Sequence, residues 1–272
     1  VYKRQPVPLL WVIPLSLYLL TFVIAFSAKN ESRLKAANQL LPYVYLPLAV
    51  LYFAVVKQMN WYLIFLHLLA FFLASLLCHG RLSLSRPSAE RLTEFYLMLS
   101  LGGLLGGVFN SIIAPVVFIR MTEYPLMLIV SSFFLLAGSE KAKETNLMKD
   151  LFMAFAVFLL GIGTTFLILM YVSVEDTPYT LLAFILPAVL CFEFKDRPFR
   201  FGFTFAAIFL FLAFGYDLQN LSVLATERNF FGIKQVCFDR ENKVRELIHG
   251  TTTHGSQSID PSVASQPLAY YH

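Results

Sequence analysis

The residues from 9 to 26, LLWVIPLSLYLLTFVIAF, form an apolar run without a single charged side chain. A helix needs about 20 such residues to cross the hydrocarbon core of a bilayer. A backbone in lipid must satisfy its own hydrogen bonds, so a run of this kind is expected to be helical. Because similar runs recur along the chain, the sequence is typical of an integral membrane protein.

Eight apolar runs are candidates for membrane spans, and the chain is 58% hydrophobic with only 14% charged residues. Soluble domains carry about 25% charged residues, so the composition favours a membrane protein. We therefore predict an all-α polytopic bundle of about eight spans over residues 1–216, in which the shorter fifth and seventh runs are candidates for tilted or re-entrant segments. The runs cover residues 8–27, 40–57, 61–78, 93–118, 124–138, 150–173, 178–194 and 201–216.

Basic residues are distributed unevenly among the loops. Loops 28–39, 79–92, 139–149 and 195–200 hold three Lys or Arg each, which makes twelve, whereas the opposite side holds four. The positive-inside rule predicts that the twelve lie in the cytoplasm. With eight full spans, both termini would then lie outside, and one re-entrant run would reverse the side of the C-terminal tail. The net charge of +4 fits anionic lipid headgroups and gives no indication of nucleic-acid binding.

The sequence changes character from about residue 217, and we predict a small β-hairpin-rich segment over residues 217–272. Runs rich in β-branched and aromatic residues at 229–239 and 244–253 flank the polar turn 240–243, which predicts an antiparallel hairpin. Residues 258–267 are rich in Ser and Pro and are expected to form a loop. A segment this short does not bury a stable core alone, so it is expected to pack on the helices or on further chain.

Several polar or small residues occur inside the fourth run. Glu94 is expected in the first turn of that helix, where a carboxylate complements the helix dipole, or else inside the membrane. Asn110 is predicted to be an interhelical hydrogen-bonding group. Gly102 and Gly106 are spaced by four residues, as are Gly103 and Gly107, and this GxxxG spacing favours close helix packing.

No complete catalytic or metal-binding motif is present. His249 and His254 are five residues apart, a spacing that suits neither one strand face nor one helix face, and zinc needs three or four ligands. We therefore predict no metal site. The nucleophile elbow, the HExxH motif, the Walker loop and the GxGxxG fingerprint are all absent.

Residues 78–118 and 227–261 together resemble bacterial proteins in which a major-facilitator-like membrane region is fused to a spermidine-synthase-like domain. Residues 9–22 resemble the same proteins. The resemblance implies a multi-pass protein of the bacterial inner membrane, with further spans before Val1 and a methyltransferase-like domain after His272. It also implies polyamine aminopropyltransferase chemistry, with decarboxylated S-adenosylmethionine as co-substrate of the complete family member.

The resemblance implies three substrate-binding residues. Gln257 corresponds to the Gln that contacts the nucleoside, and Tyr271 and His272 correspond to the start of a Tyr-His-Glu motif that lines the amine channel. His249 replaces the family's Asp, the intervening gaps are longer, and the motif's Glu would follow His272. Since the glycine-rich nucleotide turn and the acid set are absent, this chain is expected to be inactive alone. The alternative is a fragment of a polytopic transporter or permease with an accessory β-tail.

Overall fold

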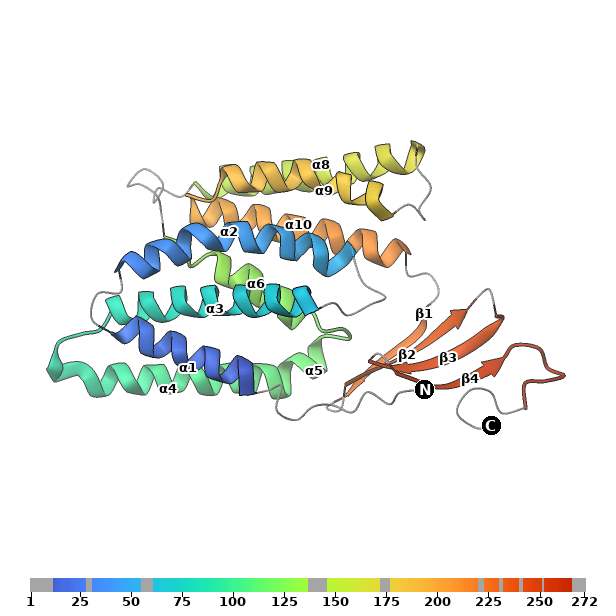
Figure 1. The fold of residues 1–272 in the computed structure, drawn as a ribbon, viewed down its shortest axis with the longest axis horizontal. Coiled ribbons are helices and arrows are strands. Elements are labelled where there is room, and N and C mark those ends of the chain that lie inside the picture. Colours follow the sequence, from blue (N-terminus) through green and yellow to red (C-terminus); the bar gives the residue numbers. More distant parts are fainter. Residues whose placement is uncertain are drawn as a thin grey trace. The chain divides into compact units, whose positions relative to one another are not determined.

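The computed structural model is mostly helical and ends in a four-stranded sheet (Figure 1). It describes residues 12–27, 31–54, 61–136, 146–171, 177–219, 223–229, 232–239, 242–250 and 252–265. The helices are α1 (Val12–Phe26), α2 (Glu31–Ala54), α3 (Trp61–Leu84), α4 (Leu92–Val108), α5 (Ala114–Val117), α6 (Glu123–Ser132), α8 (Leu147–Tyr171), α9 (Thr177–Glu193) and α10 (Pro198–Gln219). Over most of its described residues, each of the eight predicted apolar runs is helical, which confirms the helical assignment.

The chain divides into two compact units. The first contains residues 1–86 and 127–213, and the second contains residues 87–126 and 214–272. In the first unit, α2 packs on α3, α3 packs on α1, and α8 packs on α9. Leu34, Leu41 and Leu48, spaced by seven residues along α2, are fully buried there. This spacing returns to the same helix face after two turns, which gives α2 a continuous apolar stripe in the core.

Aromatic rings join α2 to α10 in the core of the first unit. The Tyr45 ring stacks on Phe205 with ring centroids 5.3 Å apart, and Phe205 stacks on Phe201 at 5.7 Å. All three side chains are fully buried. The Tyr45 hydroxyl lies 2.5 Å from Ser131 Oγ, so the polar end of this buried ring has a hydrogen-bonding partner.

Three helical segments in the described part of the chain are long and apolar enough to cross a membrane. They are Trp61–Leu84, Ala89–Val117 and Leu147–Ile168. The prediction of about eight spans is therefore too high for the described residues. The described part of α1 has 15 residues and α6 has 10, both short of the length that a bilayer requires. The start of α2 is charged, and prolines at 42 and 47 dilute its apolar composition.

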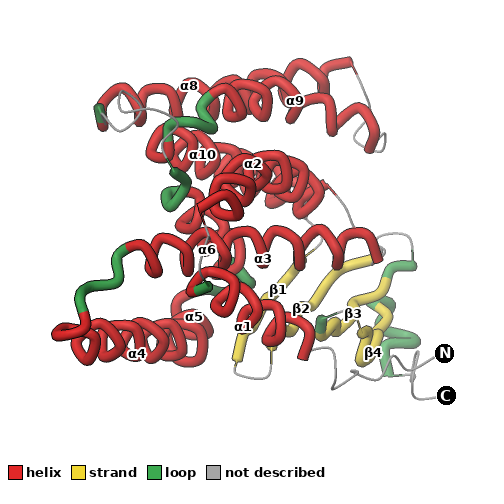
Figure 2. The backbone as a smooth tube through the Cα atoms, turned by 60° about the vertical axis from the view of Figure 1, so that its left-hand side comes forward, coloured by secondary structure: helices red, strands yellow, loops and turns green. Residues whose placement is uncertain are grey.

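The C-terminal strands form one antiparallel sheet in the order β1-β2-β3-β4 (Figure 2). They are β1 (Val223–Asn229), β2 (Gly232–Asp239), β3 (Val244–His249) and β4 (Thr252–Ser258). The predicted hairpin is confirmed as β2 and β3, in which Asp239 pairs with Val244. The prediction missed β1, and it treated β3 and the start of β4 as one strand. Gly250, at a positive φ of 61°, makes the turn that separates them.

Candidate functional site

Segments in or next to the predicted basic loops meet at one end of the first unit. Asn38, which lies on α2 although the sequence placed it in the first loop, exchanges two hydrogen bonds with the backbone of Leu136, at 2.6 and 3.3 Å. Arg81 Nη1, from the second loop, donates to the Phe134 carbonyl at 2.9 Å. Phe133 packs edge-on against Phe199 of the fourth loop, with centroids 6.0 Å apart. The described basic residues at the starts of α2, α8 and α10 and at the end of α3 therefore lie at the same end of the unit (Figure 1).

A buried ion pair joins α8 to α10 at this basic end. Arg200 Nε donates to Asp150 Oδ1 at 2.7 Å, and the two side chains are only 16% and 6% exposed. The Arg200 guanidinium carbon also lies 5.3 Å from the centre of the Phe194 ring, within cation–π range. Because Asp150 and Arg200 lie in the first turns of their helices, the pair fixes the starts of α8 and α10 against each other.

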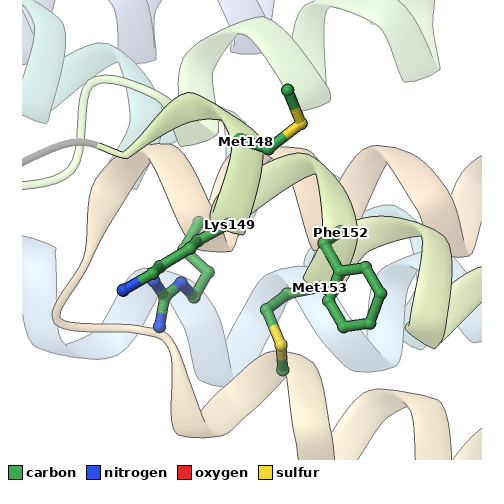
Figure 3. Close-up of a pocket in the computed structure, with 5 residues that line it drawn as sticks. Met148, Lys149, Phe152 and Met153 are labelled. Carbon is green, nitrogen blue, oxygen red and sulfur yellow. The ribbon is translucent and has the colours of Figure 1, made fainter.

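A cavity of about 440 Å³ lies beside this ion pair. It is lined by two cations and three apolar side chains: Lys149, Arg200, Met148, Phe152 and Met153 (Figure 3). Four of these residues are consecutive or nearly so on α8, whose start is capped by a hydrogen bond from the Lys149 N–H to Asn146 Oδ1. The hollow is therefore open and mainly apolar, and two of the five residues that border it are cationic.

The second unit contains a different ion pair, between β1 and the first turn of α6. Arg228 donates from Nη2 to Glu123 Oε1 at 2.6 Å and from Nη1 to Glu123 Oε2 at 2.9 Å. Arg228 Nη1 also donates to the Arg120 carbonyl at 2.6 Å. The hydrogen bond from Arg228 lowers the pKa of Glu123, and the same bond raises the pKa of Arg228. This bidentate pair attaches the edge strand of the sheet to the segment that follows α5.

The three residues assigned to substrate by resemblance are only partly described. Gln257 lies on β4 with an exposed side chain, directly opposite Arg245 in the register of the sheet. Its amide nitrogen is 3.5 Å from the Ala264 carbonyl, a long contact that a ligand can replace. Tyr271 and His272 lie outside the described residues. The grouping of these three residues therefore remains a prediction.

His249 and His254 are closer than their sequence spacing indicates. Their ring centroids are 5.7 Å apart because the turn at Gly250 folds β4 back along β3. A Cβ atom placed on Gly232 would lie 2.7 Å from His249 Nε2, so the absence of a side chain there makes room for this ring. Two ligands are fewer than zinc requires. Within the described ranges, no group of three or more His, Cys, Asp or Glu converges as a metal site.

The residues predicted in the fourth run occupy one continuous helical segment. Glu94 lies exposed in the first turn of α4, one of the two positions considered for it. Asn110 lies in a π-helical turn at Phe109–Ile113, where its amide donates to the Gly106 carbonyl of its own helix at 3.2 Å. A Cβ atom on Gly102 or Gly106 would meet no atom within 4 Å in the described structure, so close packing at the GxxxG spacing stays a prediction.

Sequence reasoning missed both ion pairs. Asp150 carries a usable signal, because it is the only acidic residue in the apolar run 150–173 and so requires a cationic partner. Arg200 belongs to a predicted loop, and its partner is 50 residues away along the chain. Arg228 and Glu123 are separated by 105 residues, and neither belongs to a recognisable motif.

Comparison with known proteins gives no family assignment, since no family model, curated protein or solved structure matches this chain.

Proposed function

We propose that this chain is a multi-pass component of the bacterial inner membrane, and that it forms the membrane-embedded and β-rich part of a spermidine-synthase-like fusion protein. The observation that carries the proposal is the order of elements. A four-stranded antiparallel meander follows α10, and it contains most of residues 227–261, one of the blocks on which the resemblance rests. The resemblance requires a small β-rich subdomain at this place.

The strands of the sheet are incompletely buried, which supports the proposal that the sheet packs against a further part of a larger protein. No residue in the described parts of β1 to β4 is buried, although every strand contains residues of intermediate exposure. An antiparallel sheet normally packs one face on a core. Leu224 and Leu247 are 55% and 42% exposed. Such a sheet fits a subdomain that supplies one wall of a larger site.

Aminopropyl transfer makes specific demands on that site. The attacking amine must be neutral, a C–N bond forms as the C–S bond of the sulfonium breaks, and the amine then loses a proton to an acceptor. Gln257 has an exposed amide that can donate to and accept from a nucleoside. This single contact supplies binding without the acid set that transfer requires. We therefore expect this chain to bind the co-substrate weakly and not to turn it over.

Two measurements on the full chain in lipid nanodiscs test the proposal. Calorimetric titration with decarboxylated S-adenosylmethionine is expected to show binding that falls at least tenfold in Gln257→Ala. Gln235→Ala is the matched control, because Gln235 lies on β2 and its side chain belongs to the other face of the sheet. Absence of binding by the wild-type chain, or equal losses in the two variants, would overturn the assignment of Gln257.

Membrane insertion is tested separately. Washing native membranes at alkaline pH removes peripheral proteins, whereas a chain with transmembrane helices stays in the pellet. The three candidate spans predict retention. Release into the supernatant would contradict the membrane part of the proposal, whatever the result of the ligand titration.

A transport function is the second candidate, and the π-helical turn Phe109–Ile113 within the span Ala89–Val117 favours it. Such turns occur often at functional sites. If this turn forms part of a transport path, Asn110→Ala abolishes uptake of labelled spermidine by proteoliposomes. Ser100→Ala is the control, because Ser100 makes a similar bond, to the Tyr96 carbonyl at 2.9 Å, in the regular part of α4. Spermidine uptake at the rate of empty liposomes would reject this candidate.

A further inference from the structure

We propose that the cavity between the starts of α8 and α10 binds the phosphate headgroup of an anionic membrane phospholipid. The proposal rests on the membrane location proposed above, and it is independent of aminopropyl transfer. It concerns the five residues that line the cavity, namely Met148, Lys149, Phe152, Met153 and Arg200 (Figure 3).

The positive charge at the cavity is arranged for a phosphate. Asp150 holds Arg200 through Nε, so this contact leaves the two terminal nitrogens of the guanidinium for another acceptor. Guanidinium groups bind phosphate through such paired nitrogens. Lys149 contributes a second cation from an exposed position at the start of α8. Lys149 and Arg200 are positively charged and Asp150 is negatively charged, so these three residues together carry a net charge of +1.

The apolar wall distinguishes a lipid from a free anion. Met148 and Phe152 are 78% and 67% exposed, although both are large apolar side chains beside the cations. Both lie in the candidate span Leu147–Ile168, where lipid chains would cover them in the proposed membrane location, and a free phosphate ion offers nothing to cover them. A phospholipid presents a phosphate and apolar chains within one molecule. Its headgroup matches Lys149 and Arg200, and its chains match the exposed side chains of α8.

The place of the cavity agrees with the side of the membrane on which anionic lipids accumulate. Lys149 and Arg200 belong to two loops that the charge bias predicts to be cytoplasmic. The Asp150–Arg200 bond shows that these two loops meet in the same unit. The cytoplasmic leaflet is rich in anionic headgroups, and basic pockets between helices on that side bind them. Charge, shape and location therefore indicate the same ligand class.

Native mass spectrometry of the full chain, exchanged into mixed vesicles of phosphatidylglycerol and phosphatidylcholine, tests this site. The wild-type chain is expected to retain phosphatidylglycerol at least fivefold over phosphatidylcholine. Lys149→Gln should reduce this preference to below twofold, and Lys149→Arg should restore it. Lys35→Gln is the matched control, because Lys35 is an exposed cation near the start of α2 in the same unit and does not line the cavity.

Three results would overturn the lipid site. The first is equal retention of the two lipids by the wild-type chain. The second is an equal loss in Lys149→Gln and Lys35→Gln, which would show a diffuse charge effect. The third is complete displacement of phosphatidylglycerol by millimolar inorganic phosphate, which would assign the cavity to a free anion. Release of the chain by the alkaline wash would contradict the proposed membrane location. Because that measurement does not depend on the cavity, failure of the membrane proposal can be distinguished from failure of the lipid site.

Discussion

Arg228 and Glu123 form a bidentate ion pair, with hydrogen bonds of 2.6 and 2.9 Å between the guanidinium and the carboxylate. Their side chains are 10% and 18% exposed, so the pair is largely shielded from water. It attaches an edge strand of few apolar residues to the segment after α5. Hydrogen bonds to charged groups each contribute about 1.5–3 kcal/mol, which makes this pair a principal attachment of β1.

Replacing Arg228 with Lys is expected to weaken β1 although the charge is kept. A lysine ammonium does not reproduce the planar fork that meets both carboxylate oxygens. We expect amide hydrogen exchange in β1 and β2 to become at least tenfold faster in Arg228→Lys and faster still in Arg228→Ala. Arg245→Ala is the control, since Arg245 is an exposed cation on β3 of the same sheet. Unchanged protection in Arg228→Ala would contradict the role of the pair.

Acid is expected to loosen the same attachment. The hydrogen bond from Arg228 lowers the pKa of Glu123 below the ordinary value of 4.5. The folded state therefore prefers the ionised form, and this contribution to stability is present above pH 4.5. It is lost as the pH falls through the lowered pKa of the folded state.

Amide exchange of β1 at pH 6 and at pH 3.5, each corrected for the intrinsic exchange rate, measures this loss. The wild-type chain should lose protection at the lower pH. Glu123→Gln should be less protected at pH 6 and should show a smaller further loss. Glu227→Gln, which changes an exposed carboxyl on β1 itself, should behave as the wild type does. An identical pH response in Glu123→Gln and wild type would exclude Glu123 as the titrating group.

Strong local patterns in the sequence predicted the helices and the central hairpin. Apolar runs leave the backbone no partner other than itself, and each of the eight runs is helical over most of its described residues. The hairpin was predictable because β2 and β3 flank a polar turn. In contrast, β4 (TTHGSQS) has no apolar side chain and β1 (VLATERN) has its apolar residues consecutive rather than alternating, and both are held by ladder hydrogen bonds to one neighbouring strand. Such bonds do not depend on the side chains, so composition gives no signal for them.

The number of spans and the ion pairs depend on information beyond local patterns. An apolar helix can be too short for a bilayer, as the described part of α6 is, and composition alone does not fix its length. The Arg200 partner of Asp150 is set by the packing of α8 and α10, which brings together residues 50 positions apart. The proximity of His249 and His254 follows from a turn at Gly250 that the predicted single strand did not contain.

Two glycine-to-alanine changes are expected to have opposite effects. A Cβ atom at Gly161 would lie 2.8 Å from the Phe211 ring, which is only 3% exposed and has little room to move. Overpacking of this kind costs about 1–3 kcal/mol and outweighs the gain of about 1 kcal/mol in helix propensity. A Cβ atom at Gly102 would meet no other part of the described structure within 4 Å, so only the gain remains.

Thermal unfolding in detergent micelles measures both variants. Gly161→Ala should lower the melting temperature, whereas Gly102→Ala should leave it unchanged or raise it. A stabilised Gly161→Ala would show that Phe211 is not fixed as described. If Gly102→Ala instead destabilises the chain in bilayers but not in micelles, a second helix packs on this face in the membrane, as the GxxxG spacing predicts.

Removal of Asp150 is expected to destabilise the first unit strongly. Arg200 would keep its charge at 16% side-chain exposure without the carboxylate that compensates it. Breaking a buried pair from one side costs about 3–5 kcal/mol, whereas replacing both partners with apolar groups is often neutral. Unfolding is measured in mixed micelles with an increasing mole fraction of SDS. The variant Asp150→Leu should unfold at a lower mole fraction of SDS than the double variant Asp150→Leu with Arg200→Met.

The exposed pair Lys195–Asp196 provides the control for this experiment. Its charged atoms are 3.9 Å apart and the Asp196 side chain is 65% exposed, so Asp196→Leu should change the unfolding free energy by less than about 1 kcal/mol. If Asp150→Leu and the double variant unfold at the same SDS fraction, Arg200 gains a new partner or reaches water when Asp150 is lost. If Asp150→Leu behaves like Asp196→Leu, the pair does not hold the starts of α8 and α10 together.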